Sequence, residues 1–183
     1  MSEAHPLPLP TALLLDTSFL RTIGGTESDT YQTFIQYVKA EGVHLYLTPG
    51  IVEEVSEQQG YISIDWVDRA DTTEWITLLD TVQPGVRVHE GPRAGEVMDR
   101  VHERLAKLEQ TDPDELRKTD SELPAAAVML LGSTAHESVG ILIDDRNAER
   151  AMSGVINNTY YEGRIRVLSI RDAIEYMEQS QFD

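Results

Sequence analysis

Acidic side chains occupy four places in this chain where an apolar run or a helix begins or ends. They are Asp16, the pair Glu53–Glu54, Asp120 and the pair Asp144–Asp145. In parallel α/β folds, ligands bind outside the carboxyl ends of the strands, where such side chains gather. Carboxylates that meet repel one another unless a proton or a cation compensates them. Because Mg²⁺ and Mn²⁺ prefer oxygen ligands, the pattern predicts a metal-dependent phosphodiesterase.

The chemistry expected from these carboxylates is hydrolysis by a metal-activated water. A two-metal nuclease needs carboxylates that converge on ions about 3.5–4 Å apart. If the strands before Asp16 and Asp145 are neighbours, both side chains project into one crevice, and Glu54 and Asp120 reach it from the starts of their helices. The chain has no cysteine, and its five histidines show no close metal-ligand spacing. We therefore expect neither a thiolate nucleophile nor a zinc site.

Each acidic position also has a structural interpretation. Asp16 could cap the helix that follows it, and Asp120 could be the N-cap of a helix over 121–131. Glu53–Glu54 near a helix N-terminus would offset the helix dipole, and Asp144–Asp145 could belong to an ordinary turn. The metal-site interpretation gains its weight from the four positions taken together, in their order along the chain.

Short apolar runs and helical spacing predict the elements that must position these acids. Buried strands are expected over Thr11–Asp16, Val43–Leu47, Gly140–Asp145 and Arg164–Ile170. Helices are expected over Thr30–Ala40, Pro49–Gly60, the second half of Tyr61–Asp80, Arg93–Glu109, Leu116–Leu131, Arg146–Ile156 and Arg171–Gln179. Strands that alternate with helices predict an α/β fold built on a parallel sheet.

Composition predicts one cytoplasmic domain. The 183 residues, 40% of them hydrophobic, suffice for a single core over 1–183. Residues 1–10, which include three prolines, are expected to form a flexible N-terminal tail. No apolar run approaches the roughly 20 residues that span a bilayer, and the start lacks the basic region of a signal peptide. We therefore expect no membrane partner.

The net charge of −17 is unusual for a protein that binds nucleic acid. The chain has 32 acidic and 15 basic residues, whereas nucleic-acid binders gain affinity from basic surfaces. We interpret this surface as a halophilic adaptation to concentrated intracellular salt, which screens the repulsion. An ordinary acidic cytosolic protein is the alternative.

Basic residues nevertheless cluster in one part of the chain. Seven of the 15 lie between Arg87 and Lys118. Four of them share a face of the helix expected over Arg93–Glu109, namely Arg93, Arg100, Arg104 and Lys107. This face could guide an RNA backbone. The alternative is that these side chains pair with Glu96 and Glu103 along the same helix.

Four motifs resemble, in order, those of the PIN-domain ribonucleases. They are DTSFL at 16–20, TPGIVEEV at 48–55, KTDSELPAAAVML at 118–130 and ILIDDRNAERA at 141–151. The resemblance extends from about Leu13 to Met177. In appearance the chain is similar to the archaeal RNA-ligase-partner branch, which has an extra helical insertion where this chain has residues 91–116.

The resemblance implies a three-layer sandwich around a mainly parallel sheet, with Mg²⁺ or Mn²⁺ in an acidic pocket. Residue by residue, it implies that the catalytic acids are Asp16, Glu54, Asp120 and Asp145, and that Glu54 is favoured over Glu53. It implies metal ligation by Asp16, Asp120 and Asp145, with Asp144 and Asn147 beside them. Ser18 matches the hydroxyl that orients the first aspartate.

Two positions depart from the family pattern. Many relatives have an acid at the position of Asn147, and many have Ser or Thr at that of Ile143. Asparagine can ligate through its carbonyl oxygen but brings no charge, so a second ion would bind weakly.

Three functions follow from these observations. The first is a metal-dependent endoribonuclease acting on single-stranded or structured RNA. The second is a weak or inactive PIN-like module that binds RNA or protein in RNA repair or processing. The third is the toxin of a toxin–antitoxin pair, for which the chain is longer than expected. A homodimer and a protein partner stay open.

Overall fold

The computed structural model describes residues 7–57 and 73–180. At its centre is a five-stranded sheet in which all neighbouring strands are parallel. The strands are β1 (Ala12–Leu15), β2 (His44–Leu47), β3 (Ile76–Leu78), β4 (Val139–Ile143) and β5 (Ile165–Ser169). Their spatial order is β3-β2-β1-β4-β5. The chain therefore runs outward from β1 to β3 and returns to β4 on the other side of β1, which places a topological switch point between β1 and β4.

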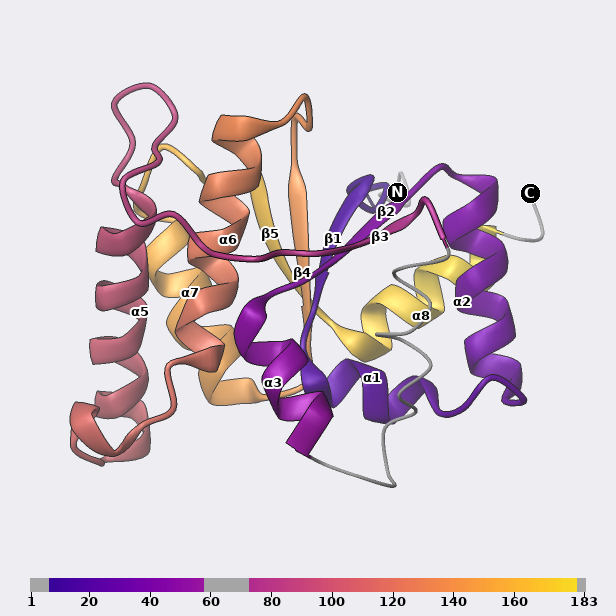
Figure 1. Ribbon diagram of the computed structural model, residues 1–183, viewed down its shortest axis with the longest axis horizontal. Coiled ribbons are helices and arrows are strands. Elements are labelled where there is room, and N and C mark those ends of the chain that lie inside the picture. Colours follow the sequence, from indigo (N-terminus) through magenta and orange to yellow (C-terminus); the bar gives the residue numbers. More distant parts are fainter. Residues whose placement is uncertain (1–6, 58–72, 181–183) are drawn as a thin grey trace, which may run out of the picture.

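Helices cover both faces of the sheet and complete a three-layer sandwich. On one side lie α5 (Ala94–Glu109), α6 (Thr119–Ser133) and α7 (Arg146–Ile156), and on the other α1 (Thr17–Ile23), α2 (Asp29–Ala40) and α8 (Ile170–Ser180) (Figure 1). Helix α3 (Pro49–Glu57) lies near the lower ends of β1 and β4, and the short 3₁₀ helix η1 (Pro113–Glu115) joins α5 to α6. No helix among the described residues is long and apolar enough to cross a bilayer.

The central strands are buried on both faces, as a covered parallel sheet requires. Every residue of β1 and of β4 is buried. Gly140 of β4 leaves room for the Leu13 side chain, since an added Cβ there would stand 2.7 Å from a Leu13 methyl carbon. The parallel pairing, with Leu15 opposite Leu142, brings the carboxyl ends of β1 and β4 together.

The outermost helix, α5, packs on α6 and α7 rather than on the sheet (Figure 1). It buries an apolar stripe that includes Val97, Val101 and Leu105, and it begins one residue after the predicted start. With η1 it forms the helical insertion expected around residues 91–116. The helix over Arg146–Ile156 has the predicted bounds.

Two expectations need correction, and a third is tested only in part. The second half of Tyr61–Asp80 is not helical where it is described, because Ile76–Leu78 pairs with β2 as an edge strand. The helix from Pro49 is described only to Glu57, and residues 58–72 lie outside the described part. Leu9 and Pro10 are buried, which shortens the flexible tail expected over residues 1–10.

Candidate active site

The pairing of β1 with β4 places two of the four acids at the same edge of the sheet, just beyond the ends of the two strands. Leu15 lies opposite Leu142, and the backbone N–H of Asp16 continues the ladder by donating to the carbonyl of Leu142 at 3.1 Å. Asp16 directly follows β1, and Asp145 follows β4 by two residues. Both acids therefore lie at the switch point, as the sequence predicts for neighbouring strands.

Both aspartates also cap helices. Asp16 is the N-cap of α1 and accepts a hydrogen bond of 3.0 Å from the backbone N–H of Ser18. Asp145 is the N-cap of α7 and accepts one of 2.9 Å from Ala148. Asp16 therefore caps the helix that follows it, as its structural interpretation predicts. Capping fixes each carboxylate at the amino end of a helix, where the helix dipole favours negative charge.

Ser18 connects Asp16 to the segment that follows β4. Its hydroxyl donates a short hydrogen bond to the same Asp16 oxygen that accepts from its backbone N–H. The hydroxyl oxygen in turn accepts from the backbone N–H of Asp144 at 3.2 Å. Ser18 therefore has the contacts that an orienting hydroxyl needs.

Glu54 reaches the site from the second half of α3, not from its start as expected, because the helix already begins at Pro49. Its carboxylate accepts a 2.5 Å hydrogen bond from the Thr17 hydroxyl. The other oxygen lies 3.9 Å from an Arg117 nitrogen. That ion pair is weak, because the Arg117 side chain is 74% exposed. Glu53 is exposed.

Asp120 is the acid whose surroundings penalise its charge most clearly. It is the second residue of α6, after the N-cap Lys118, so it is not itself the N-cap. Burial is the largest cause that raises the pKa of Asp120 to about 7, and the nearby charges of Asp16, Asp145 and Glu54 contribute to this rise in that order of importance. The other three sequence-predicted acids therefore lie within electrostatic reach of Asp120.

Asp16 is perturbed in the same direction. It is only 6% exposed, and this burial raises the pKa of its carboxyl. The hydrogen bonds from Ser18 oppose the rise, whereas the charge of Glu54 adds to it. Excess negative charge at this edge of the sheet is what a cation would relieve.

The site fits a hard divalent ion in the kind of donor it offers. All four groups are carboxylates, whose oxygens Mg²⁺ and Mn²⁺ prefer. In the described part of the chain, however, no three Asp, Glu or His side chains stand close enough together to hold one ion. The carboxylates of Asp16, Glu54 and Asp145 are turned toward their own hydrogen-bond donors. Ligation would require them to turn inward.

The two remaining predicted ligands lie at the rim. Asp144 is exposed and lines a groove of about 650 Å³ beside α1 and α8, together with Thr22 and Arg171. Asn147 is half-buried in the first turn of α7. Of the four basic residues predicted on α5, all are exposed.

A cleft of about 470 Å³ opens beside Glu54, between α3, α5 and the start of α6. Arg117, Lys118 and Glu122 are among its lining residues. The backbone N–H of Gly50 donates to the Glu122 carboxylate at 3.0 Å, and an added Cβ at Gly50 would stand 2.6 Å from that oxygen. The first turns of α3 and α6 are thereby joined.

Sequence reasoning missed three of these contacts. Thr17 could have been found, because it lies between Asp16 and Ser18 in the first motif. No local signal marks Arg117 as a neighbour of Glu54, or Gly50 as a donor to Glu122, because both contacts join segments far apart in the chain.

The parallel sheet covered by helices on both faces is consistent with a PIN-like three-layer sandwich, and comparison with known families agrees. The sequence matches the model of the halobacterial PIN domain over residues 9–182. The chain therefore belongs to the halobacterial PIN domain family, and PIN domains are generally nucleases. No curated protein matched the sequence. The resemblance to PIN-domain proteins is confirmed, whereas the likeness to the RNA-ligase-partner branch stays a prediction.

Proposed function

We propose that this protein is a divalent-metal-dependent endoribonuclease that hydrolyses RNA phosphodiester bonds at the carboxylate site. The observation that carries the proposal is the grouping of four acids near the carboxyl ends of β1 and β4, where burial and then the charges of the other acids raise the pKa of Asp120 to about 7. Membership of a family of nuclease-type modules supports it. When bound, Mg²⁺ or Mn²⁺ would supply a water of lowered pKa as nucleophile and would neutralise the leaving oxygen.

The role that we propose for each residue follows from its position. Asp16, Asp120 and Asp145 would hold the ion, and Glu54 would act beside them from α3. Ser18 would orient Asp16 through the hydrogen bonds that it donates. Asp144 and Asn147 at the rim would add oxygen ligands, of which only Asp144 is charged.

The decisive test is Asp16→Asn. Loss of this carboxylate should reduce cleavage of a mixed RNA by about 100-fold or more, since even residues that only orient a ligand are worth 10–100-fold. Thermal unfolding should stay near that of the wild type, because an asparagine oxygen can still accept from Ser18. Cleavage is measured with Mn²⁺ and with Mg²⁺ at low and at molar KCl, since we infer from the charge of −17 that the protein is salt-adapted.

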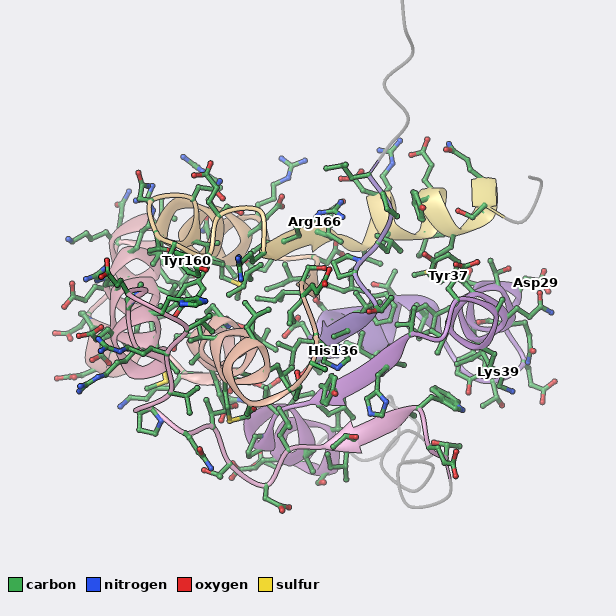
Figure 2. All side chains as sticks on the ribbon, turned by 90° about the horizontal axis from the view of Figure 1, so that it is seen from above. Asp29, Tyr37, Lys39, His136, Tyr160 and Arg166 are labelled. Atoms are coloured by element: carbon green, nitrogen blue, oxygen red, sulfur yellow. The ribbon has the colours of Figure 1, made fainter. Side chains whose placement is uncertain are left out.

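Asp29→Asn is the matched control, because Asp29 lies on α2 at the opposite end of the molecule from α5 (Figure 2). It removes the same charge and should leave cleavage unchanged. Equal activity in Asp16→Asn and wild type would refute the proposed site. Activity that persists in EDTA would refute the metal dependence.

A second function remains a candidate, namely a weak or inactive PIN-like module that binds RNA or a protein partner. It is favoured by the finding that no three Asp, Glu or His side chains among the described residues stand close enough together to hold one ion, and by the missing charge at Asn147. Calorimetric titration with Mn²⁺ separates the two functions. Heat that disappears in Asp16→Asn supports the nuclease, and no heat at either salt concentration supports the inactive module.

A further inference from the structure

A small groove of about 280 Å³ lies between α5 and α7, away from the carboxylates. We call it the α5–α7 groove, and it is lined by Arg100, Glu103, Arg104, Lys107 and Val155. Three cations and one acid give it a positive charge on a protein whose net charge is −17. Three of the four basic residues predicted on α5 therefore share a concave surface, and Arg93 does not belong to it.

The three cations are not neutralised by neighbours on their own helix. The alternative expected from the sequence, ion pairs with Glu96 and Glu103, is not observed among the described residues. Glu96 instead accepts a hydrogen bond from the backbone N–H of Arg93 at 2.8 Å. The positive charge of the groove is thus available to an anion from solution.

Arg104 is held in the groove by its packing against α7. An added Cβ at Gly154 would stand 2.5 Å from the central guanidinium carbon of Arg104, so the guanidinium lies against the α7 backbone. Only glycine leaves room for it there. Glycine is the poorest helix former apart from proline, and its presence inside α7 coincides with the point where Arg104 crosses. A side chain that is already placed loses less freedom when it binds an anion.

Each of the two helices that line the groove has one end near the carboxylate site. Asp145 begins α7, and Glu109 at the end of α5 is one of the charges that raise the pKa of Asp120. Along α7, the ten residues from Asp145 to Val155 correspond to about 15 Å at a rise of 1.5 Å per residue.

We propose that the α5–α7 groove binds the phosphodiester backbone of the same single RNA strand that the carboxylates cleave. The ligand class follows from three cations along a narrow groove, which contacts a backbone and reads no bases. The proposal deepens the proposed function and rests on it for the identity of the polyanion.

The test measures RNA binding without metal or cleavage, so its result does not depend on nuclease activity. Fluorescence anisotropy of a labelled 20-nucleotide oligouridylate is recorded in EDTA with the Asp16→Asn protein as parent. Combining Arg100→Gln, Arg104→Gln and Lys107→Gln should weaken binding by roughly 10-fold or more. It should also reduce the slope of log affinity against log salt by about 2, since single strands lose about 0.7 for each phosphate contact.

Lys39→Gln in the same parent is the control, because Lys39 is exposed on α2 and lies far from α5 (Figure 2). It should leave both the affinity and the salt slope near those of the parent. If the parent does not bind, or if the triple change leaves the affinity and the slope unaltered, the proposal is overturned.

Gly154→Ala tests the groove without changing any charge. The added methyl group displaces Arg104 from α7 and should weaken binding about threefold, whereas thermal stability should not fall because alanine favours the helix. Gly25→Ala is the matched control, since an added Cβ there meets nothing within 4 Å. Equal affinities for the two alanine variants would show that the placement of Arg104 plays no part in binding.

Discussion

The two ends of the parallel sheet accommodate polar side chains in opposite ways. At the carboxyl end, acids of like charge face one another, and burial raises the pKa values of Asp16 and Asp120. At the amino end of β4, a ring nitrogen of His136 lies 2.8 Å from the Tyr46 hydroxyl; His136 is labelled in Figure 2. A ring nitrogen of His44 lies 2.6 Å from the hydroxyl oxygen of Thr77. At one end, groups of like charge repel one another, whereas at the other end the polar groups form hydrogen bonds with one another.

The protonation states of His44, His136 and Tyr46 explain why these groups need no counter-ion. Burial lowers the pKa values of both His44 and His136 and raises that of Tyr46. All three groups are therefore neutral near pH 7, and each can satisfy a neighbour without a counter-ion. The carboxylates lack such partners among themselves. Sites whose polar groups remain in conflict are the expected places for function, and satisfied networks for stability.

The largest expected effect is on stability at the carboxyl end. The pKa of Asp120 rises from 3.8 to about 7 in the fold, so the metal-free folded protein binds more protons than the unfolded chain between these pH values. Stability should fall as pH rises through this window, by up to roughly 4 kcal/mol. Asp120→Asn removes the penalty, and its gain over wild type should be larger at pH 8 than at pH 5.

The measurement is urea denaturation of both proteins in EDTA at the two pH values. A stability gain that is the same at pH 5 and pH 8 would show that Asp120 is not strained by its charge. The same outcome would mean that the charge of Asp120 does not destabilise the carboxyl end of the sheet, so that the two ends would not differ in this respect.

An intermediate effect is expected from Ser18→Ala. Without its hydroxyl, Asp16 loses a donor and the backbone N–H of Asp144 loses an acceptor, so Mn²⁺ affinity should drop about 10–100-fold by calorimetry. Ser56→Ala is the control, since the Ser56 hydroxyl is exposed and bonds to the Val52 carbonyl of its own helix. Similar affinities for both variants would exclude Ser18 as the orienting residue.

The smallest effect is expected at the other end of the sheet. Tyr46→Phe removes the hydroxyl that meets His136 and should lower the free energy of unfolding by about 1 kcal/mol, with Mn²⁺ binding unchanged. Tyr160→Phe on the surface, where the side chain is 40% exposed, should change stability by less than about 0.5 kcal/mol. A loss of Mn²⁺ affinity in Tyr46→Phe would mean that the two ends of the sheet are coupled.

The sequence predicts most of the fold because its strongest local signals agree with the packing. The runs TALLLD and GILIDD are continuous and apolar, as strands covered on both faces must be. The edge strand β3 was missed because Ile76–Leu78 is only three residues long and only Ile76 is buried. A strand of that length has too little periodicity to distinguish it from a helix.

The sequence predicts which acids come together at the site, but it does not predict the hydrogen bonds of their carboxylates. Asp16 and Asp145 follow two apolar runs, so a parallel sheet with neighbouring β1 and β4 brings them together. Their hydrogen-bonding state cannot be read from spacing, because it depends on donors such as Thr17 and Ser18 and on side-chain rotation. The pairing of Glu54 with Arg117 depends on how α3 packs near the start of α6.

The hydrogen bond from Gly50 to Glu122 has a mechanical consequence. It joins the first turn of α3, four residues before Glu54, to the first turn of α6, two residues after Asp120. The two helices that carry these carboxylates are therefore tethered to each other at their first turns. A displacement of one helix against the other would stretch this hydrogen bond, so the tether opposes changes in the distance between Glu54 and Asp120.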